Sequence, residues 1–147
     1  MTSGLLIMEY RFCVTAKLAA SLSDVFVLLS DPRRRPEWQS SLRRVIMLDP
    51  GTPRIGTRWR DVTVIGAQPE LEITEWETDR RWTEVGRWHG VTVVGTLTFS
   101  PVDQCCTVNA TATITAPGWR IPIGWGAALL APRGIRHDLH RAGRLLG

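Results

Sequence analysis

The feature that most constrains the fold is a change of periodicity along the chain. Residues 43–115 are rich in Thr, Val, Ile and Trp, and turn residues divide them at intervals of roughly ten positions. This pattern predicts six successive antiparallel strands. After Pro117-Gly118 the apolar residues recur every three or four positions, which predicts a long closing helix over 121–146 with an interruption near Pro132.

The N-terminal part predicts a further strand. Residues 5–17 alternate between apolar and mostly polar side chains, as in a strand with one face toward the core. The expected inward side chains are Met8, Tyr10, Phe12 and Val14. The chain has 147 residues, about one domain's worth, and contains no repeat or linker, so we expect a single domain over residues 1–147.

Two helices are predicted between this strand and the strand-rich region. Ser21 has the context of a helix N-cap, with Asp24 three positions later in capping-box geometry. A second, short helix is expected to carry Pro36 in its first turn. Trp38 and Leu42 lie four positions apart and should face inward together.

Together these elements predict an α+β protein. Their order is one strand, two helices, six strands and a final helix, which gives a seven-stranded antiparallel sheet with helices on one side. If the sheet curves strongly around the terminal helix, a gap remains between them, and side chains from both line it.

Several segments resemble one known superfamily. They are VFVLLSDPRRRPEW (25–38), IGTRWR (55–60), ITEWETDRRW (73–82), TLTFSPVDQCCTV (96–108) and LLAPRGIRHDLHRAGRLL (129–146). In kind and order they are similar to segments of the START/Bet v 1-like (SRPBCC) superfamily, in its polyketide cyclase/dehydrase-type branch. The resemblance implies a helix-grip fold, a curved sheet around the C-terminal helix with an apolar cavity between them.

The superfamily resemblance leaves the function open. Members bind lipids, sterols, polyketides or other flat hydrophobic molecules, and some catalyse aldol cyclisation and dehydration of polyketide chains; fold alone does not choose among these. The related aromatase/cyclases use cavity Arg and Tyr groups. Here the only Tyr is Tyr10, and the strand expected over 69–77 contains no Arg, so no complete catalytic set maps onto the chain.

Strand alternation predicts which side chains face the gap. Arg58 and Arg60 prefer water, which places Trp59 and Asp61 on the inner face. The same reasoning applied to the other strands and the closing helix gives a Trp-rich inner set, for which simple core packing is the alternative. The candidate ligand contacts are Trp38, Trp59, Ile73, Trp82, Trp88, Val93, Leu97, Trp125 and Leu129.

Three carboxylates share the expected inner faces: Asp61, Glu75 and Glu84. Burial raises the pKa of a carboxyl group and favours general-base chemistry next to a carbonyl, so these are the candidate catalytic residues. Each could instead hydrogen-bond a ligand hydroxyl. The structural alternative is that they pair with Arg at the cavity mouth, or that the assumed strand register is wrong by one residue.

The charge pattern argues against a nucleic-acid partner. The net charge is +4, but the only tight basic cluster is Arg33-Arg34-Arg35, and acidic residues are interleaved with the basic ones elsewhere. We interpret these charges as solvated surface.

No sequence motif indicates a metal or a cofactor. The three cysteines, Cys13, Cys105 and Cys106, lack the CxxC spacing of a zinc site, and their odd number does not suit a disulfide framework. His137 and His140 fall on the polar side of the closing helix. The cysteine usage, the absence of a signal peptide and the lack of a membrane-spanning segment favour a cytoplasmic location.

Three functions therefore remain open. The first is binding of a hydrophobic small molecule, of the polyketide, isoprenoid or lipid kind, in a Trp-rich cavity. The second is a polyketide cyclase or dehydratase that uses a cavity carboxylate for proton transfer. The third is a regulatory or protein-interaction module in which the uncharged stretch 121–132 forms a homodimer or membrane-touching surface.

Overall fold

The computed structural model describes residues 6–147, with side chains described for 6–120 and 131–147. One antiparallel sheet contains all seven strands, in the order β1-β7-β6-β5-β4-β3-β2, which confirms the predicted α+β class. The elements are β1 (Ile7–Leu18), α1 (Leu22–Ser30), the 3-10 turn η1 (Pro32–Arg34), α2 (Arg35–Trp38), β2 (Leu42–Met47), β3 (Arg58–Thr63), β4 (Glu70–Glu77), β5 (Arg81–Trp88), β6 (Val91–Val102), β7 (Cys105–Pro117), η2 (Gly118–Arg120) and α3 (Ile121–Leu146).

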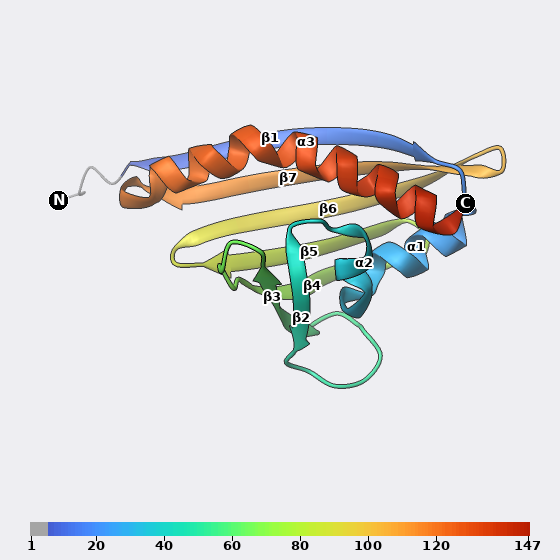
Figure 1. Ribbon diagram of the computed structural model, residues 1–147, viewed down its shortest axis with the longest axis horizontal. Helices are drawn as coiled ribbons and strands as arrows, with labels where there is room; N and C mark the ends of the chain where they lie inside the picture. Colours follow the sequence, from blue (N-terminus) through green and yellow to red (C-terminus); the bar gives the residue numbers. More distant parts are fainter. Residues whose placement is uncertain (1–5) are drawn as a thin grey trace.

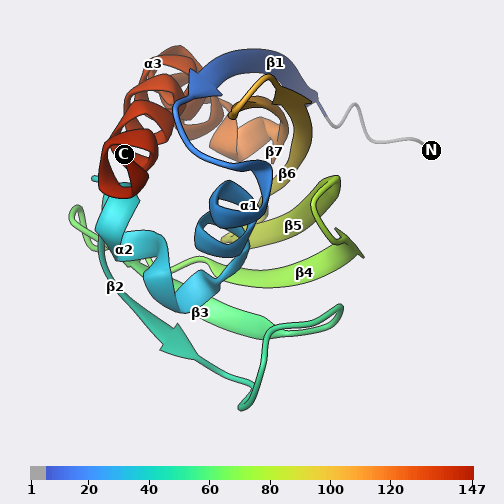
Figure 2. The same cartoon turned by 90° about the vertical axis from the view of Figure 1, so that its right-hand side faces the viewer.

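The sheet is strongly curved, and the helices lie on its concave side (Figures 1 and 2). Helix α3 runs along the length of the molecule beside β1 (Figure 1), and α2 lies below the C-terminal end of α3 (Figure 2). The first strand pairs with the last one, from Ile7 opposite Pro117 to Leu18 opposite Cys106. The first and last strands in sequence are therefore neighbours in the sheet. β1 forms one edge of the sheet and β2 the opposite edge.

The expected first strand and first helix are confirmed. Along β1, Met8 and Val14 are buried while the alternate residues Glu9 and Cys13 are exposed, as period-two alternation requires. The Ser21 hydroxyl accepts a hydrogen bond from the Asp24 backbone N–H at 3.2 Å, which caps α1.

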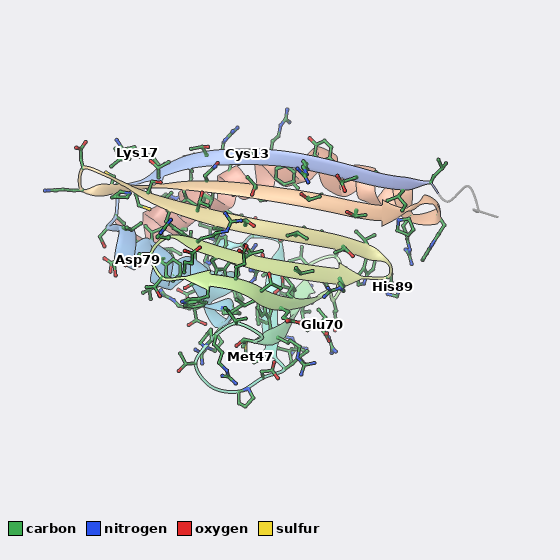
Figure 3. All side chains as sticks on the ribbon, turned by 180° about the vertical axis from the view of Figure 1, so that it is seen from behind. Cys13, Lys17, Met47, Glu70, Asp79 and His89 are labelled. Carbon is green, nitrogen blue, oxygen red and sulfur yellow. The ribbon has the colours of Figure 1, made fainter. Side chains whose placement is uncertain are left out.

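The convex face of the sheet carries mostly polar side chains (Figure 3). Cys13 and Lys17 project from β1, and Asp79 and His89 mark hairpin ends at opposite extremities of the molecule (Figure 3). His89 has a φ of 46°, and Gly90 beside it has a φ of 83°. The predicted turn at His89-Gly90 is therefore confirmed as the β5–β6 hairpin.

Two expectations about the helices are wrong. The second helix ends at Trp38, and Leu42 instead begins strand β2, because the backbone at Gln39 has already become extended, with a ψ of 107°. Trp38 and Leu42 are nevertheless both buried. Helix α3 continues through Pro132 without the expected interruption. Burial of Leu139 and Ala142 in the core stabilises the helix enough to offset the hydrogen bond that the proline lacks.

Among the residues that the structure describes, no helix is long and apolar enough to cross a membrane.

Candidate functional site

A cavity of about 410 Å³ lies between the concave face of the sheet and helices α2 and α3. Its walls come from α2, from strands β3 to β7, from the loop between β3 and β4, and from the C-terminal half of α3. Most of the lining side chains are apolar, and Glu84 and Arg35 are the charged groups on the α2 side of the cavity. The apolar lining includes Trp38, Leu71, Trp82, Trp88, Val91, Val93, Leu97, Ile135 and Leu139.

Small residues on the central strands keep this space open. Gly95 on β6 lies directly opposite Ala112 on β7, and Leu97 lies opposite Ala110. Gly86 on the neighbouring strand also borders the cavity. Glycine has no side chain and alanine only a methyl group, so neither projects far from the concave face of the sheet. A void therefore remains between the larger side chains around them.

The structure brings five of the predicted ligand contacts to the cavity wall. Trp59 and Ile73 are fully buried but do not line it, because both lie in the packed core. Trp125 and Leu129 have side chains outside the described residues. The predicted contacts that line the cavity are Trp38, Trp82, Trp88, Val93 and Leu97.

Trp59 packs against Trp82, which lines the cavity. Its ring stacks on Trp82, with centroids 6.3 Å apart and an interplanar angle of 25°. Its indole Nε1 donates a hydrogen bond to Asp61 Oδ1 at 3.0 Å, and the Arg35 guanidinium lies 5.4 Å from the ring centroid. Trp59 therefore joins the apolar core to a buried group of charges.

The charges form a three-residue cluster at the edge of the cavity. Arg35 on α2 donates from Nη1 to Glu84 Oε2 at 2.9 Å and from Nη2 to Asp61 Oδ2 at 3.1 Å. The side chains of Arg35 and Asp61 are 4% and 6% exposed, and that of Glu84 is 18% exposed. One guanidinium thus holds two carboxylates from two different strands.

Local structure explains how Arg35 reaches this position. The Asp31 side chain accepts a hydrogen bond from the Arg33 backbone N–H and starts the short turn that leads into α2. Beyond α2, the backbone N–H and hydroxyl of Ser40 both donate to Asp138 on α3, at 3.2 and 2.9 Å. Arg141 Nε donates to the Glu37 carbonyl at 3.0 Å. The contacts of Glu37 and Ser40 attach the C-terminal end of α2 to α3, and Arg35 at its other end lies against the sheet through Asp61 and Glu84.

Arg35 is a site residue that the sequence analysis missed. The cluster Arg33-Arg34-Arg35 was interpreted as solvated surface, which holds for exposed Arg33 but is wrong for Arg35. A signal was present, because carboxylates on an inner face need a counter-charge. The alternative of pairing with Arg is confirmed for Asp61 and Glu84.

Glu75 does not face the cavity. The pairing of β4 with β5 shifts between Ile73 and Glu75, which is a β-bulge that turns Glu75 to the outer side. There it accepts hydrogen bonds from the Thr83 hydroxyl at 2.6 Å and from Arg81 at 3.2 Å, and the two bonds lower its pKa, Thr83 more than Arg81. The bulge places Trp76 against Phe26 in the core, with ring centroids 5.4 Å apart.

Burial and charge act in opposite directions on Glu84. Burial raises the pKa of its carboxyl group, Arg35 lowers it, and the neighbouring charge of Asp61 raises it further, so the net pKa is above that of an ordinary glutamate. For Arg35, burial lowers the pKa, but the attraction of Asp61 and Glu84 outweighs burial, and the net pKa is raised.

The oxygens of the two carboxylates differ in availability. Both oxygens of Asp61 accept hydrogen bonds, from Trp59 and from Arg35. Glu84 Oε2 is bound to Arg35, whereas Glu84 Oε1 accepts no hydrogen bond from the described residues and is not among the fully buried unpartnered atoms. Chemically, Glu84 Oε1 is therefore the atom of this cluster that can accept a proton or a hydrogen bond from a molecule in the cavity.

Among the side chains that the structure describes, the remaining titratable groups form no comparable site. His137 and His140 are exposed, as the sequence predicts, while Asp138 between them is buried against Ser40. The described residues contain no group of three or more His, Cys, Asp or Glu side chains that could hold a metal ion.

Comparison with known proteins gives one family and many structural neighbours. The family profile for "polyketide cyclase / dehydrase and lipid transport" matches residues 10–145. No curated protein matches the chain.

Three solved structures illustrate the likeness of fold. The two-domain aromatase/cyclase StfQ of the steffimycin biosynthetic pathway has a TM-score of 0.75 at 14% identity; 96% of this chain aligns with 51% of that protein, about half its length. The XoxI protein of Bacillus cereus has a TM-score of 0.74 at 13% identity, covering 92% of this chain and 94% of the other. Truncated norcoclaurine synthase from Thalictrum flavum has a TM-score of 0.71 at 13% identity, covering 95% and 94%. At these identities the likeness establishes the fold alone.

Proposed function

Because the chain belongs to the polyketide cyclase/dehydrase and lipid transport family, we propose that it binds an apolar small molecule, of the polyketide, isoprenoid or lipid kind, in the cavity beside α2. The observation that carries this proposal is the cavity itself, about 410 Å³ with a mostly apolar lining. This volume lies within the range of about 300–1,000 Å³ typical of small-molecule sites. Trp38, Trp82 and Trp88 provide flat apolar surface for the ligand.

Filling the cavity should abolish binding. In Ala112→Phe, the new ring projects from β7 into the void, so the ligand and the ring compete for the same space. We expect at least a tenfold loss of affinity for naphthalene-2-ethanol, a neutral aromatic probe. The free energy of unfolding should stay close to that of the wild type, because the ring occupies existing space. Titration calorimetry and thermal unfolding measure the two quantities.

The matched control for this variant is Thr113→Phe, which adds the same ring to the opposite face of the same strand. It should bind the probe as the wild type does. The proposal fails if the wild type binds none of a panel of aromatic polyketides, fatty acids and naphthalene probes, or if both phenylalanine variants bind equally well.

A second candidate function is proton transfer in a cyclase or dehydratase, and the unpartnered Glu84 Oε1 favours it. A general base next to a bound ketone takes a proton from the α-carbon. The electron pair of that C–H bond forms a C=C bond, and the π pair of the carbonyl moves to its oxygen to give an enolate. A raised pKa brings a carboxylate closer to the basicity that this step requires. Asp61 has no free oxygen, and Glu75 lies outside the cavity, so Glu84 is the remaining candidate.

This second function predicts enzyme-accelerated exchange of α-hydrogens for deuterium in an apolar ketone. With 2-tetralone in D₂O, Glu84→Gln should reduce the accelerated rate by about 10²-fold or more, because the amide does not accept the proton. Proton NMR follows the exchange. Glu75→Gln is the matched control and should keep the wild-type rate. Equal rates in all three proteins would exclude Glu84 as the base while leaving ligand binding intact.

The third function stays a prediction. The side chains of residues 121–130, which make up most of the uncharged stretch, lie outside the description. The homodimer, the lack of a nucleic-acid partner and the cytoplasmic location likewise stay predictions from the sequence.

A further inference from the structure

The charges at the cavity edge do not balance. Arg35 carries one positive charge, whereas Asp61 and Glu84 carry two negative charges when both are ionised. Asp61 is already satisfied by Trp59 and Arg35. The surplus negative charge therefore resides on Glu84, whose second oxygen accepts no hydrogen bond from the side chains that the structure describes. Charges in an apolar wall are stabilised by a counter-charge or by a proton.

The free oxygen of Glu84 is open to the cavity. Glu84 lines the cavity wall and its side chain is 18% exposed. On the neighbouring strand, Gly95 has no side chain to cover it, and a Cβ at this position would lie only 3.7 Å from Oε1. Gly95 therefore leaves room for a ligand atom at hydrogen-bond distance from Oε1.

Starting from the proposed function, we propose that the ligand is an apolar amine whose protonated nitrogen donates a hydrogen bond to Glu84 Oε1. An ammonium group supplies the missing positive charge and a hydrogen-bond donor, and the remainder of the molecule occupies the apolar part of the cavity. A neutral hydroxyl supplies the donor but not the charge. A carboxylate, as in a fatty acid, adds a third negative charge beside two others.

Other polar groups near the cavity do not reverse this preference. Four further polar atoms of lining residues have no hydrogen-bond partner among the described residues: Trp38 Nε1, Trp82 Nε1, Arg35 Nε and Gln39 Oε1. These atoms are fully buried, so a ligand in the cavity does not reach them. Arg87 also borders the cavity, but it is exposed and forms no ion pair with Glu84. The charged groups that face Glu84 are Arg35 from α2 and Asp61 from β3.

Three probes with one apolar body test this inference: naphthalene-2-ethylamine, naphthalene-2-ethanol and naphthalene-2-acetic acid. Titration calorimetry at pH 7 should give the tightest binding for the amine, about tenfold weaker binding for the alcohol, and the weakest for the acid. In Glu84→Gln, the amine should bind no more tightly than the alcohol. Glu75→Gln, a charge-matched control on the outer face, should keep the wild-type order.

The outcomes separate the two proposals. If the wild type binds the alcohol and Ala112→Phe does not, ligand binding in the cavity stands. The amine inference is overturned if the acid then binds as tightly as the amine, or if Glu84→Gln leaves the ratio of amine to alcohol affinity unchanged. If none of the three probes binds the wild type, the amine inference fails, and the proposed function fails with it only if the aromatic polyketides and fatty acids do not bind either. Thermal unfolding of each variant verifies that it is folded.

Discussion

Replacing Arg35 by Met should destabilise the protein by about 3–5 kcal/mol at pH 7, because the change leaves Asp61 and Glu84 buried without their shared counter-charge. The cation–π contact with Trp59, at 5.4 Å, is lost as well. For a chain of this size the change corresponds to a fall in melting temperature of roughly 10 °C. Urea unfolding and thermal unfolding measure the effect.

The loss should depend on pH in a defined direction. Burial raises the pKa of Glu84 and Arg35 lowers it, so without Arg35 the folded-state pKa of Glu84 rises further above its unfolded value. A group with a raised folded pKa costs stability only above its unfolded pKa, about 4. The difference between variant and wild type should therefore shrink as the pH falls from 7 toward 4.

Arg34→Met provides the matched control. Arg34 is the preceding residue and pairs with Glu37 at 3.1 Å, but its side chain is 38% exposed. An exposed ion pair contributes at most about 1 kcal/mol, so this variant should be close to the wild type at every pH. Equal losses from both arginine variants would contradict the assignment of Arg35 as the buried counter-charge.

Replacing Trp59 by Ala should also cost about 3–5 kcal/mol, since it removes a fully buried indole and leaves a void behind the cavity wall. Two further effects add to this loss of stability. Trp82 loses its stacking partner, and Asp61 Oδ1 loses the hydrogen bond from the indole. Chemical unfolding at pH 7 measures the change.

Two variants separate the contributions to this loss. Trp59→Phe keeps much of the apolar ring but removes the N–H donor, and should cost about 1–3 kcal/mol through the unsatisfied buried carboxylate oxygen. Trp119→Ala removes a Trp that is 68% exposed, and should change stability by less than about 1 kcal/mol. A large loss at Trp119 together with a small one at Trp59 would contradict the packing described here.

Much of the fold could be predicted from local patterns. The alternation of apolar residues in 5–17, the Ser21 cap and the strand-rich region 43–115 are properties of neighbouring residues, and short-range physics determines them. The boundaries were less predictable. The end of α2 at Trp38 depends on where β2 begins to pair, and the continuity of α3 through Pro132 depends on packing against the sheet.

The candidate site was predictable only in part. Alternation placed Asp61 and Glu84 correctly on the inner face, because no irregularity interrupts the pairing of β5 with β6 and Asp61 follows Trp59 in regular alternation. It failed for Glu75, because a single extra residue in β4 reverses the direction of every side chain that follows. No local sequence pattern around Ile73 predicts that bulge.

The sequence by itself determined the elements, their order and the faces of the regular strands, since each follows from contacts between residues close together in the chain. Only the tertiary structure decided that Arg35 lies beside two carboxylates, which are 26 and 49 positions away in sequence. It also decided which oxygen of Glu84 stays free and which tryptophans reach the cavity. These features depend on how far the sheet curves and where α2 docks on α3, and both are set by packing between distant segments.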